Sequence, residues 1–199
     1  MSGDSAPTNL TNHFLIAMPG MEDAFFAKSV VYLVDHNDQG AMGLMINKTV
    51  DISMEALFVK IDLSMPRADL AANPVLQGGP VHQDRGFVLH DPVFGSSEPE
   101  QASPYQSTIR VPGGLDMTTS RDVLESISTG GGPKRVLVSL GYAAWGEGQL
   151  ESELKENAWL TVEADASVIF DAPMAERYDR ALGLLGLQAW MISTQAGNA

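Results

Sequence analysis

The feature of this sequence that most constrains its fold is a succession of short apolar runs that end at glycine, proline or asparagine clusters. Three such runs lie at His13–Met18, Ser29–Val34 and Ala41–Asn47, and the clearest lies at Arg135–Leu140. Runs of this length and β-branched composition predict β-strands, because such side chains fit a pleated, buried surface. The polar cluster Asp35–Gly40 predicts an antiparallel hairpin between the second and third runs.

Further short strands are expected at Val75–Val81, Arg85–His90, Thr108–Val111, Leu115–Thr118, Leu160–Glu163 and Val168–Phe170. Helical patterns are fewer. They are expected after the N-cap residue Ser53, after Ser120 as far as Ser128, at Gln149–Asn157 and at Ala175–Leu185. Hairpins dominate, and β-α-β units occur only in the C-terminal half. The sequence therefore predicts an α/β fold of the α+β type, a mixed, largely antiparallel sheet with packed helices.

The length of 199 residues fits one domain, and neither an internal repeat nor a low-complexity linker divides the chain. Residues 1–12 are small and polar and predict a flexible N-terminus. Residues 13–199 are expected to form a single domain. The segment Asp91–Pro104 is rich in proline, serine and glutamate, so we expect it to be exposed.

The absence of cysteine excludes disulfides, thiolate metal sites and a cysteine nucleophile. No lysine or arginine precedes Lys28, so the basic region of a signal peptide is missing. The apolar runs Phe14–Met18 and Ala181–Leu187 are too short to span a bilayer. We therefore expect a cytoplasmic protein that neither spans nor binds a membrane.

The formal net charge is −13, and the only adjacent basic pair is Lys134 and Arg135. This charge repels a nucleic acid at long range, and the two helices expected near Ser120 and Gln149 are not basic. The sequence thus predicts no direct contact with nucleic acid. The charge serves solubility in the simplest interpretation, and attraction of a basic protein partner is the alternative.

A metal site would need converging ligands, and the histidines form neither an HExxH nor a His-x-His pattern: His13, His36, His82 and His90. His82 and His90 could face each other across a hairpin, joined by Asp84 or Asp91. Turn or surface histidines are the simpler interpretation. We expect no metal and no cofactor.

Catalytic signatures are incomplete. Ser139 lies inside a predicted strand, and Leu137 replaces the first glycine of a nucleophile elbow. The loop Gly141–Gly148 follows a core strand but lacks the P-loop pattern. Acidic residues crowd the helix start that would face a phosphate: Glu147, Glu151 and Glu153. The spacing of Glu147 and Glu151 allows acid–base work, but a solvated helix start is favoured.

The same loop is nevertheless the best candidate for a functional surface, since a core strand delivers it to one rigid point. Its candidate binding residues are Tyr142, Trp145, Glu147 and Glu151. Trp145 is either an exposed interface anchor or a core residue, and core packing is the more frequent fate of a tryptophan.

Five stretches together resemble the YqgE/AlgH family of small bacterial proteins: Asn12–Met21, Ser29–Lys48, Leu76–Pro92, Val138–Leu160 and the tail around Arg177 to Leu187. Small departures are Ala144, where the family has Gly, Lys48 for Arg and Tyr178 for Trp. The resemblance implies one α/β domain in the bacterial cytoplasm, with its sheet folded toward a pseudo-barrel. One branch of the family carries the label of transcriptional regulator, and no agreed catalytic residue, substrate or cofactor comes with it.

These observations favour a non-catalytic regulatory or interaction protein, which acts through an unidentified protein partner rather than by binding DNA. The alternative is an enzyme or small-molecule-binding protein that uses the loop Gly141–Gly148. A pocket at that loop, with a perturbed glutamate or histidine, would favour the alternative.

Overall fold

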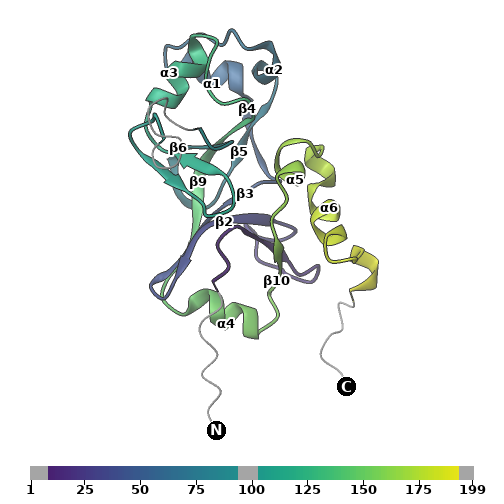
Figure 1. Ribbon diagram of the computed structural model, residues 1–199. Coiled ribbons are helices and arrows are strands. Elements are labelled where there is room, and N and C mark those ends of the chain that lie inside the picture. The colour runs from purple at the N-terminus through teal and green to yellow at the C-terminus, as the bar shows by residue number, and fades with distance from the viewer. Residues whose placement is uncertain (1–8, 94–102, 193–199) are drawn as a thin grey trace, which may run out of the picture.

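A single curled sheet organises the computed structural model, which describes residues 9–93 and 103–192 (Figure 1). Within those residues the strands are β1 His13–Ala17, β2 Val30–Asn37, β3 Gly40–Met45, β4 Thr49–Ser53, β5 Pro74–Gln77, β6 Val81–His90, β7 Thr108–Arg110, β8 Asp116–Thr118, β9 Val136–Trp145 and β10 Trp159–Glu163. Their order is β10-β1-β2-β3-β9-β6-β8-β7, and β5 joins β4 to β9.

The strand pairs are antiparallel except for β5 and β9, which run parallel. The mixed, largely antiparallel sheet predicted from the sequence is therefore confirmed. So is the hairpin of β2 and β3, in which Asn37 pairs with Gly40 across the polar turn.

Strand β9 belongs to both halves of the sheet. Its first half lies between two partners, since Leu140 pairs with Gly86 of β6 and with Gln77 of β5. Its second half pairs with β3, where Trp145 lies opposite Ala41. One long strand thus connects the upper and lower parts of the molecule in Figure 1.

The helical elements are α1 Met54–Lys60, α2 Ala68–Ala71, α3 Asp122–Ser128, α4 Gln149–Lys155, α5 Ala166–Phe170, η1 Met174–Glu176, α6 Arg177–Gly183 and η2 Ala189–Met191. In Figure 1, α1, α2 and α3 lie at one end of the sheet, α4 lies at the other, and α5 and α6 lie to one side. None of the helices in the described residues has both the length and the apolar character needed to cross a membrane.

Local side chains explain where helices α1 and α5 begin, whereas α3 begins without a side-chain cap. Ser53 caps α1 as expected, with its Oγ accepting from Ala56 N at 3.1 Å. Ser120 does not cap α3, because its hydroxyl donates to Asp122 instead, at 2.5 Å, and Arg121 precedes the helix without a side-chain cap. The strand expected at Val168–Phe170 was wrong. Asp165 accepts from Ser167 N at 2.9 Å, and this cap starts helix α5.

The strands nearest the N-terminus are buried on both faces, which is why their sequences are continuously apolar rather than alternating. Phe14 and Tyr32 belong to the core cluster that α5 and α6 cover. Leu15 and Leu33 point to the opposite cluster, which includes Leu150 of α4. A third cluster lies under α1 and α3 and includes Phe58 and Ile127.

The flexible segment expected at residues 1–12 falls partly outside the described residues. Within the described part, Leu10 is buried, and Asn12 N donates to Leu33 O at 2.9 Å. Asn12 O in turn accepts from Ala164 N at 3.0 Å. Residues 10–12 therefore lie between β2 and the end of β10. Most of the exposed segment expected at Asp91–Pro104 also lies outside the described residues.

Candidate functional site

The glycine-rich segment chosen from the sequence is mostly strand. Strand β9 continues through Trp145, so the expected loop Gly141–Gly148 shortens to the turn at residues 146–148 before α4. Gly148 adopts φ +72° and precedes the first helical residue. The expectation of a long presented loop was therefore wrong, because ladder pairing with β3 fixes the backbone of residues 143–145.

Trp145 is a core residue. Its side chain is only 5% exposed and packs with Phe26 and Trp159, whose ring centroids lie 6.0 and 5.9 Å away. The indole Nε1 donates to Glu153 Oε2 at 2.9 Å. Of the two alternatives left open by the sequence, the structure places Trp145 in the interior.

The other three candidates have separate surroundings. Tyr142 points to the opposite face of β9, half-buried between His82 and Phe87 at centroid distances of 5.8 and 5.2 Å. Glu147 is exposed in the turn, and Glu151 contacts a histidine. A binding role for Tyr142, Trp145, Glu147 and Glu151 stays a prediction.

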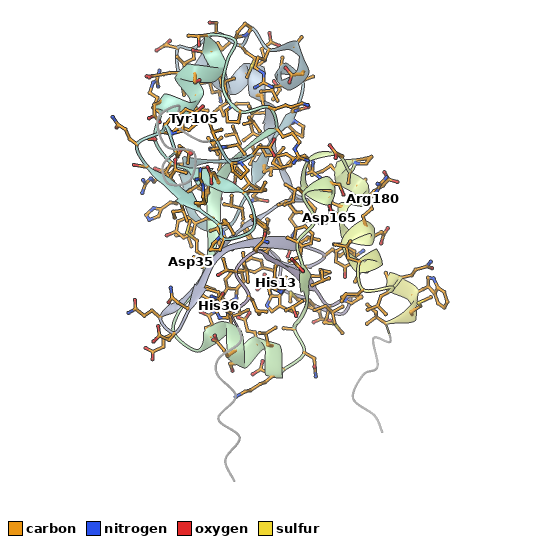
Figure 2. The ribbon with its side chains drawn as sticks, in the orientation of Figure 1. His13, Asp35, His36, Tyr105, Asp165 and Arg180 are labelled. Atoms are coloured by element: carbon orange, nitrogen blue, oxygen red, sulfur yellow. The ribbon has the colours of Figure 1, made fainter. Side chains whose placement is uncertain are left out.

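His36, near the tip of the β2–β3 hairpin, lies beside α4 (Figure 2) and contacts Glu151 of that helix. His36 Nδ1 accepts from Leu10 N at 3.0 Å, so the ring proton lies on Nε2, which donates to Glu151 Oε1 at 2.6 Å. This bond holds the pKa of the Glu151 carboxyl below its usual value. The buried histidine thus fastens the N-terminal segment and α4 to the same strand.

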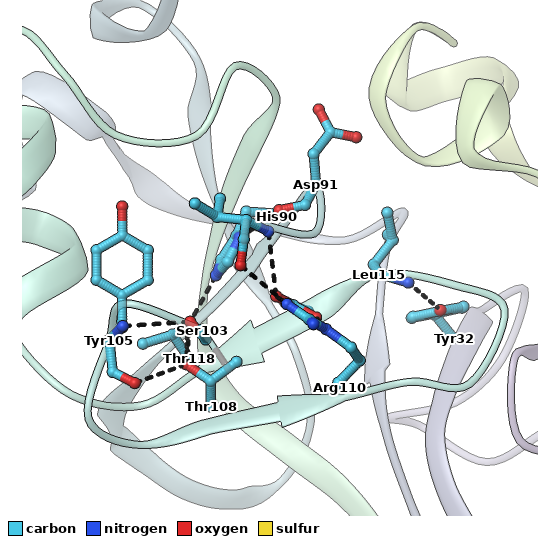
Figure 3. Close-up of polar contacts among 11 residues, drawn as sticks. Tyr32, His90, Asp91, Ser103, Tyr105, Thr108, Arg110, Leu115 and Thr118 are labelled. Carbon is cyan, nitrogen blue, oxygen red and sulfur yellow. Dashed lines mark hydrogen bonds and ion pairs between the residues drawn. The ribbon is translucent and has the colours of Figure 1, made fainter. Parts of the chain in front are cut away.

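His90 is buried in a polar network between β6 and β8 (Figure 3). Its Nδ1 donates to Asp91 O at 2.7 Å, and Nε2 accepts from the Thr118 hydroxyl at 2.8 Å. Thr118 is bonded in turn to Thr108 of β7, also at 2.8 Å. Burial lowers the pKa of His90, so the neutral ring is favoured. The network binds three strands together.

The hairpin that would have placed His82 opposite His90 does not form, because both residues lie on β6. Positive φ at His82 and a register shift between Val81 and Gly86 turn the intervening residues outward. The described residues contain no group of three histidines and carboxylates that could hold a metal ion. Ser139 is buried in mid-strand, where its hydroxyl donates to Gly141 O at 3.1 Å.

Two hollows flank α6, and sequence reasoning missed both. The first has a volume of about 430 Å³ and lies between α6 and the ends of the first strands. Its lining includes Pro19, Lys28, Lys48 and Tyr178. The Tyr178 hydroxyl donates to Ala17 O at 2.6 Å and so fixes α6 against β1.

The second hollow, of about 800 Å³, lies between α6 and η2. Trp190 lies at its edge with 76% of its surface exposed, and Met191, Leu184 and Leu185 are also exposed. Arg180 extends outward from α6 nearby (Figure 2). The sequence signal was the apolar run Ala181–Leu187, which continues past the two apolar residues that α6 buries, Ala181 and Leu182.

Comparison with known proteins gives consistent matches along the chain. A family model described as AlgH-like matches residues 14–190. A UPF0301 protein of Acidovorax sp. (strain JS42) is 65% identical, and one of Delftia acidovorans is 63% identical, with the whole of each chain covered. The solution structure of AlgH from Pseudomonas aeruginosa is 47% identical with a TM-score of 0.74, over 98% of each chain. A crystal structure from Corynebacterium diphtheriae shares the fold at 21% identity and a TM-score of 0.67, over 88% of this chain and 87% of that one.

Proposed function

The chain belongs to the AlgH-like family, and from that premise we propose that it is a non-catalytic interaction protein of the cytoplasm, whose surface at α6 and η2 binds a protein partner. The label of transcriptional regulator that one branch of the family carries supports a regulatory outcome of this binding. The effect on gene expression then passes through the partner.

The observation that carries the proposal is the exposure of Trp190 beside the larger hollow. A tryptophan with 76% of its surface in solvent exposes a large apolar area that folding alone leaves uncovered. Tryptophan is one of the residues enriched among the anchors of protein interfaces. Met191 is also exposed and lines the same hollow together with Leu187, and exposed apolar surface of this kind marks interaction sites.

The charge of this surface indicates what kind of protein partner it would bind. The lining of the larger hollow includes Glu176 and Asp179, together with Arg180. The chain as a whole carries a net charge of −13. An acidic surface steers a basic partner and repels nucleic acid. The proposed partner segment therefore presents apolar side chains flanked by lysine or arginine, and direct contact with DNA is not part of the proposal.

Three of the side chains considered for catalysis or metal binding, His90, Ser139 and Glu151, make structural bonds, and this supports a non-catalytic role. His90 and Ser139 are buried, and His36 Nε2 is bonded to Glu151. The alternative of an enzyme or small-molecule binder at Gly141–Gly148 loses support, since most of that segment is paired strand.

The test is affinity capture with quantitative mass spectrometry, using the wild-type chain and the double variant Trp190→Ser, Met191→Ser. The captured amount of a partner that binds through this surface should be about 30-fold lower with the double variant, because loss of an interface anchor costs about 2 kcal/mol or more of binding free energy. Each captured protein is then purified and titrated against the same two chains.

Val59→Ser is the matched control, because Val59 of α1 is an apolar side chain with 69% exposure elsewhere on the molecule. Partner binding by this variant should equal that of the wild type. Capture of the same proteins by all three chains, or an equal loss with Val59→Ser, would overturn the proposal. So would a salt-sensitive gel shift of duplex DNA by the purified protein.

A further inference from the structure

The smaller hollow beside α6 gathers positive charge on an acidic protein. Lys28 and Lys48 line it. Arg177 is not part of the lining, but its guanidinium donates to Ile46 O, two residues before Lys48. These are three of only 12 basic residues in the chain. The lining itself holds the two lysines and one carboxylate, Asp179, which leaves a net charge of +1.

Arg177 is buried without an acidic partner. Its side chain is 5% exposed, with Nε donating to Ala172 O at 3.1 Å and Nη1 donating to Ile46 O at 2.5 Å. Ion pairs within residues 9–93 and 103–192 do not include Arg177. Burial lowers the pKa of Arg177 to about 10, which still leaves the group charged at neutral pH. A buried cation is normally matched by an anion, because removing it from water is costly.

The two lysines are positioned by the backbone around them. Asn47 lies between the strands, with Oδ1 accepting from Val30 N and Nδ2 donating to Lys28 O, both at 2.8 Å. Lys28 itself adopts a positive φ of 57°. Lys48 Nζ donates to Phe25 O. Its pKa is lowered by burial and partly restored by the charge of exposed Asp23, which does not line the hollow.

The remaining walls are apolar or aromatic. Pro19, Met174, Ala175 and the ring of Tyr178 face the same space. A volume of about 430 Å³ lies within the range of small-molecule sites. A ligand that matches this lining carries a dianionic head for the cations and a compact apolar body for the walls.

We propose that this hollow is a binding site for a small phosphate monoester, with the phosphate held by Lys28 and Lys48 and supported by the charge of Arg177. A phosphate offers the oxygen acceptors that ammonium and guanidinium groups bind best. The two hollows share Asp179 and Ala189 in their linings. Lys28 and Lys48 line only the smaller one and Trp190 lines only the larger one, so either proposal can fail without the other.

The test is calorimetric titration of the full chain with phenyl phosphate, which combines a phosphate with an apolar ring. We expect saturable binding at one site, weaker binding of benzoate, and weaker binding still of neutral benzyl alcohol. Lys28→Glu should weaken the binding of phenyl phosphate by about tenfold or more, because one charge-assisted bond becomes a repulsion.

Lys60→Glu is the matched control, since Lys60 is an exposed lysine at the end of α1 and undergoes the same change of charge. It should change the affinity by less than about twofold, because distant surface charges are screened. If both variants weakened the binding of phenyl phosphate equally, the attraction would come from overall charge and not from this hollow, and the proposed site would be overturned. Absence of binding at about 10 mM phenyl phosphate, or benzoate or benzyl alcohol binding as tightly, would also overturn it.

Discussion

Trp145 donates its indole proton to Glu153 at 2.9 Å, so the polar edge of a core side chain meets a carboxylate at the boundary of the interior. The same Oε2 atom accepts from Trp159 Nε1 at 2.8 Å. One acceptor on α4 therefore satisfies two buried indoles, one from β9 and one from the start of β10.

Replacing Trp145 by alanine should destabilise the fold by about 3–5 kcal/mol, because it removes a large buried side chain from a packed aromatic cluster. Trp190→Ala is the matched control, and its exposed indole should change the free energy of unfolding by no more than about 0.5 kcal/mol. Urea denaturation of the two variants measures the difference. Equal destabilisation would contradict the assignment of Trp145 to the core.

Replacing Glu153 by leucine should cost about 1–3 kcal/mol for each indole that loses its acceptor, because water reaches neither ring freely. Glu153→Gln retains an oxygen acceptor and should cost clearly less. Urea denaturation monitored by tryptophan fluorescence distinguishes the leucine variant from the glutamine variant. If the glutamine variant is as unstable as the leucine variant, the charge rather than the acceptor is what matters.

The stability of the protein should fall as the pH drops below about 6.5, in part because of His90. Burial lowers the pKa of His90 from its usual value of 6.5. The carboxylates of Asp116 and Asp91 oppose this shift, and the positive charge of Arg110 adds to it. The unfolded chain therefore binds a proton first, and each further decrease in pH favours unfolding until the native pKa is reached.

The variant His90→Gln removes this contribution. Its free energy of unfolding should be lower than that of the wild type at pH 8, where the neutral ring makes both of its bonds. The difference should shrink as the pH falls below about 6.5. Parallel pH profiles for the two proteins would show that His90 does not contribute to the acid sensitivity.

Gly79 lies so close to β9 that a methyl group should not fit. A Cβ at this position would lie 1.9 Å from the Tyr142 carbonyl carbon, which belongs to the backbone and cannot rotate away. Gly79→Ala should cost about 1–3 kcal/mol or more, as overpacking does. Gly146→Ala, whose Cβ would meet nothing closer than 4.0 Å, should leave the melting temperature nearly unchanged.

Much of the sheet could be predicted because its strands carry their own local signals. The buried runs that became β1, β2, β3 and β9 are continuous in sequence and end at turn residues. Helix α5 was missed because its apolar run of Val168, Ile169 and Phe170 is too short to show a helical period. Its start depends instead on the cap residue Asp165.

The candidate site was harder to predict because its parts are distant in sequence. Arg177 meets Ile46 across 131 positions, and no pattern around either residue signals that contact. Trp145 was ambiguous for a similar reason. Its burial depends on packing against Phe26 and Trp159, which the residues around Trp145 in the sequence do not signal.

The position of β9 also sets the order in which the chain can fold during synthesis. Strand β3 and strand β6 both pair with β9, yet the ribosome produces them about 90 and 50 residues earlier, and such long-range pairing closes slowly. The outer edge of strand β1 stays unpaired until β10 has been synthesised. Until those late strands emerge, the open edges of β1, β3 and β6 are exposed to pairing with other chains, so the nascent protein should depend on chaperones far more than the finished one.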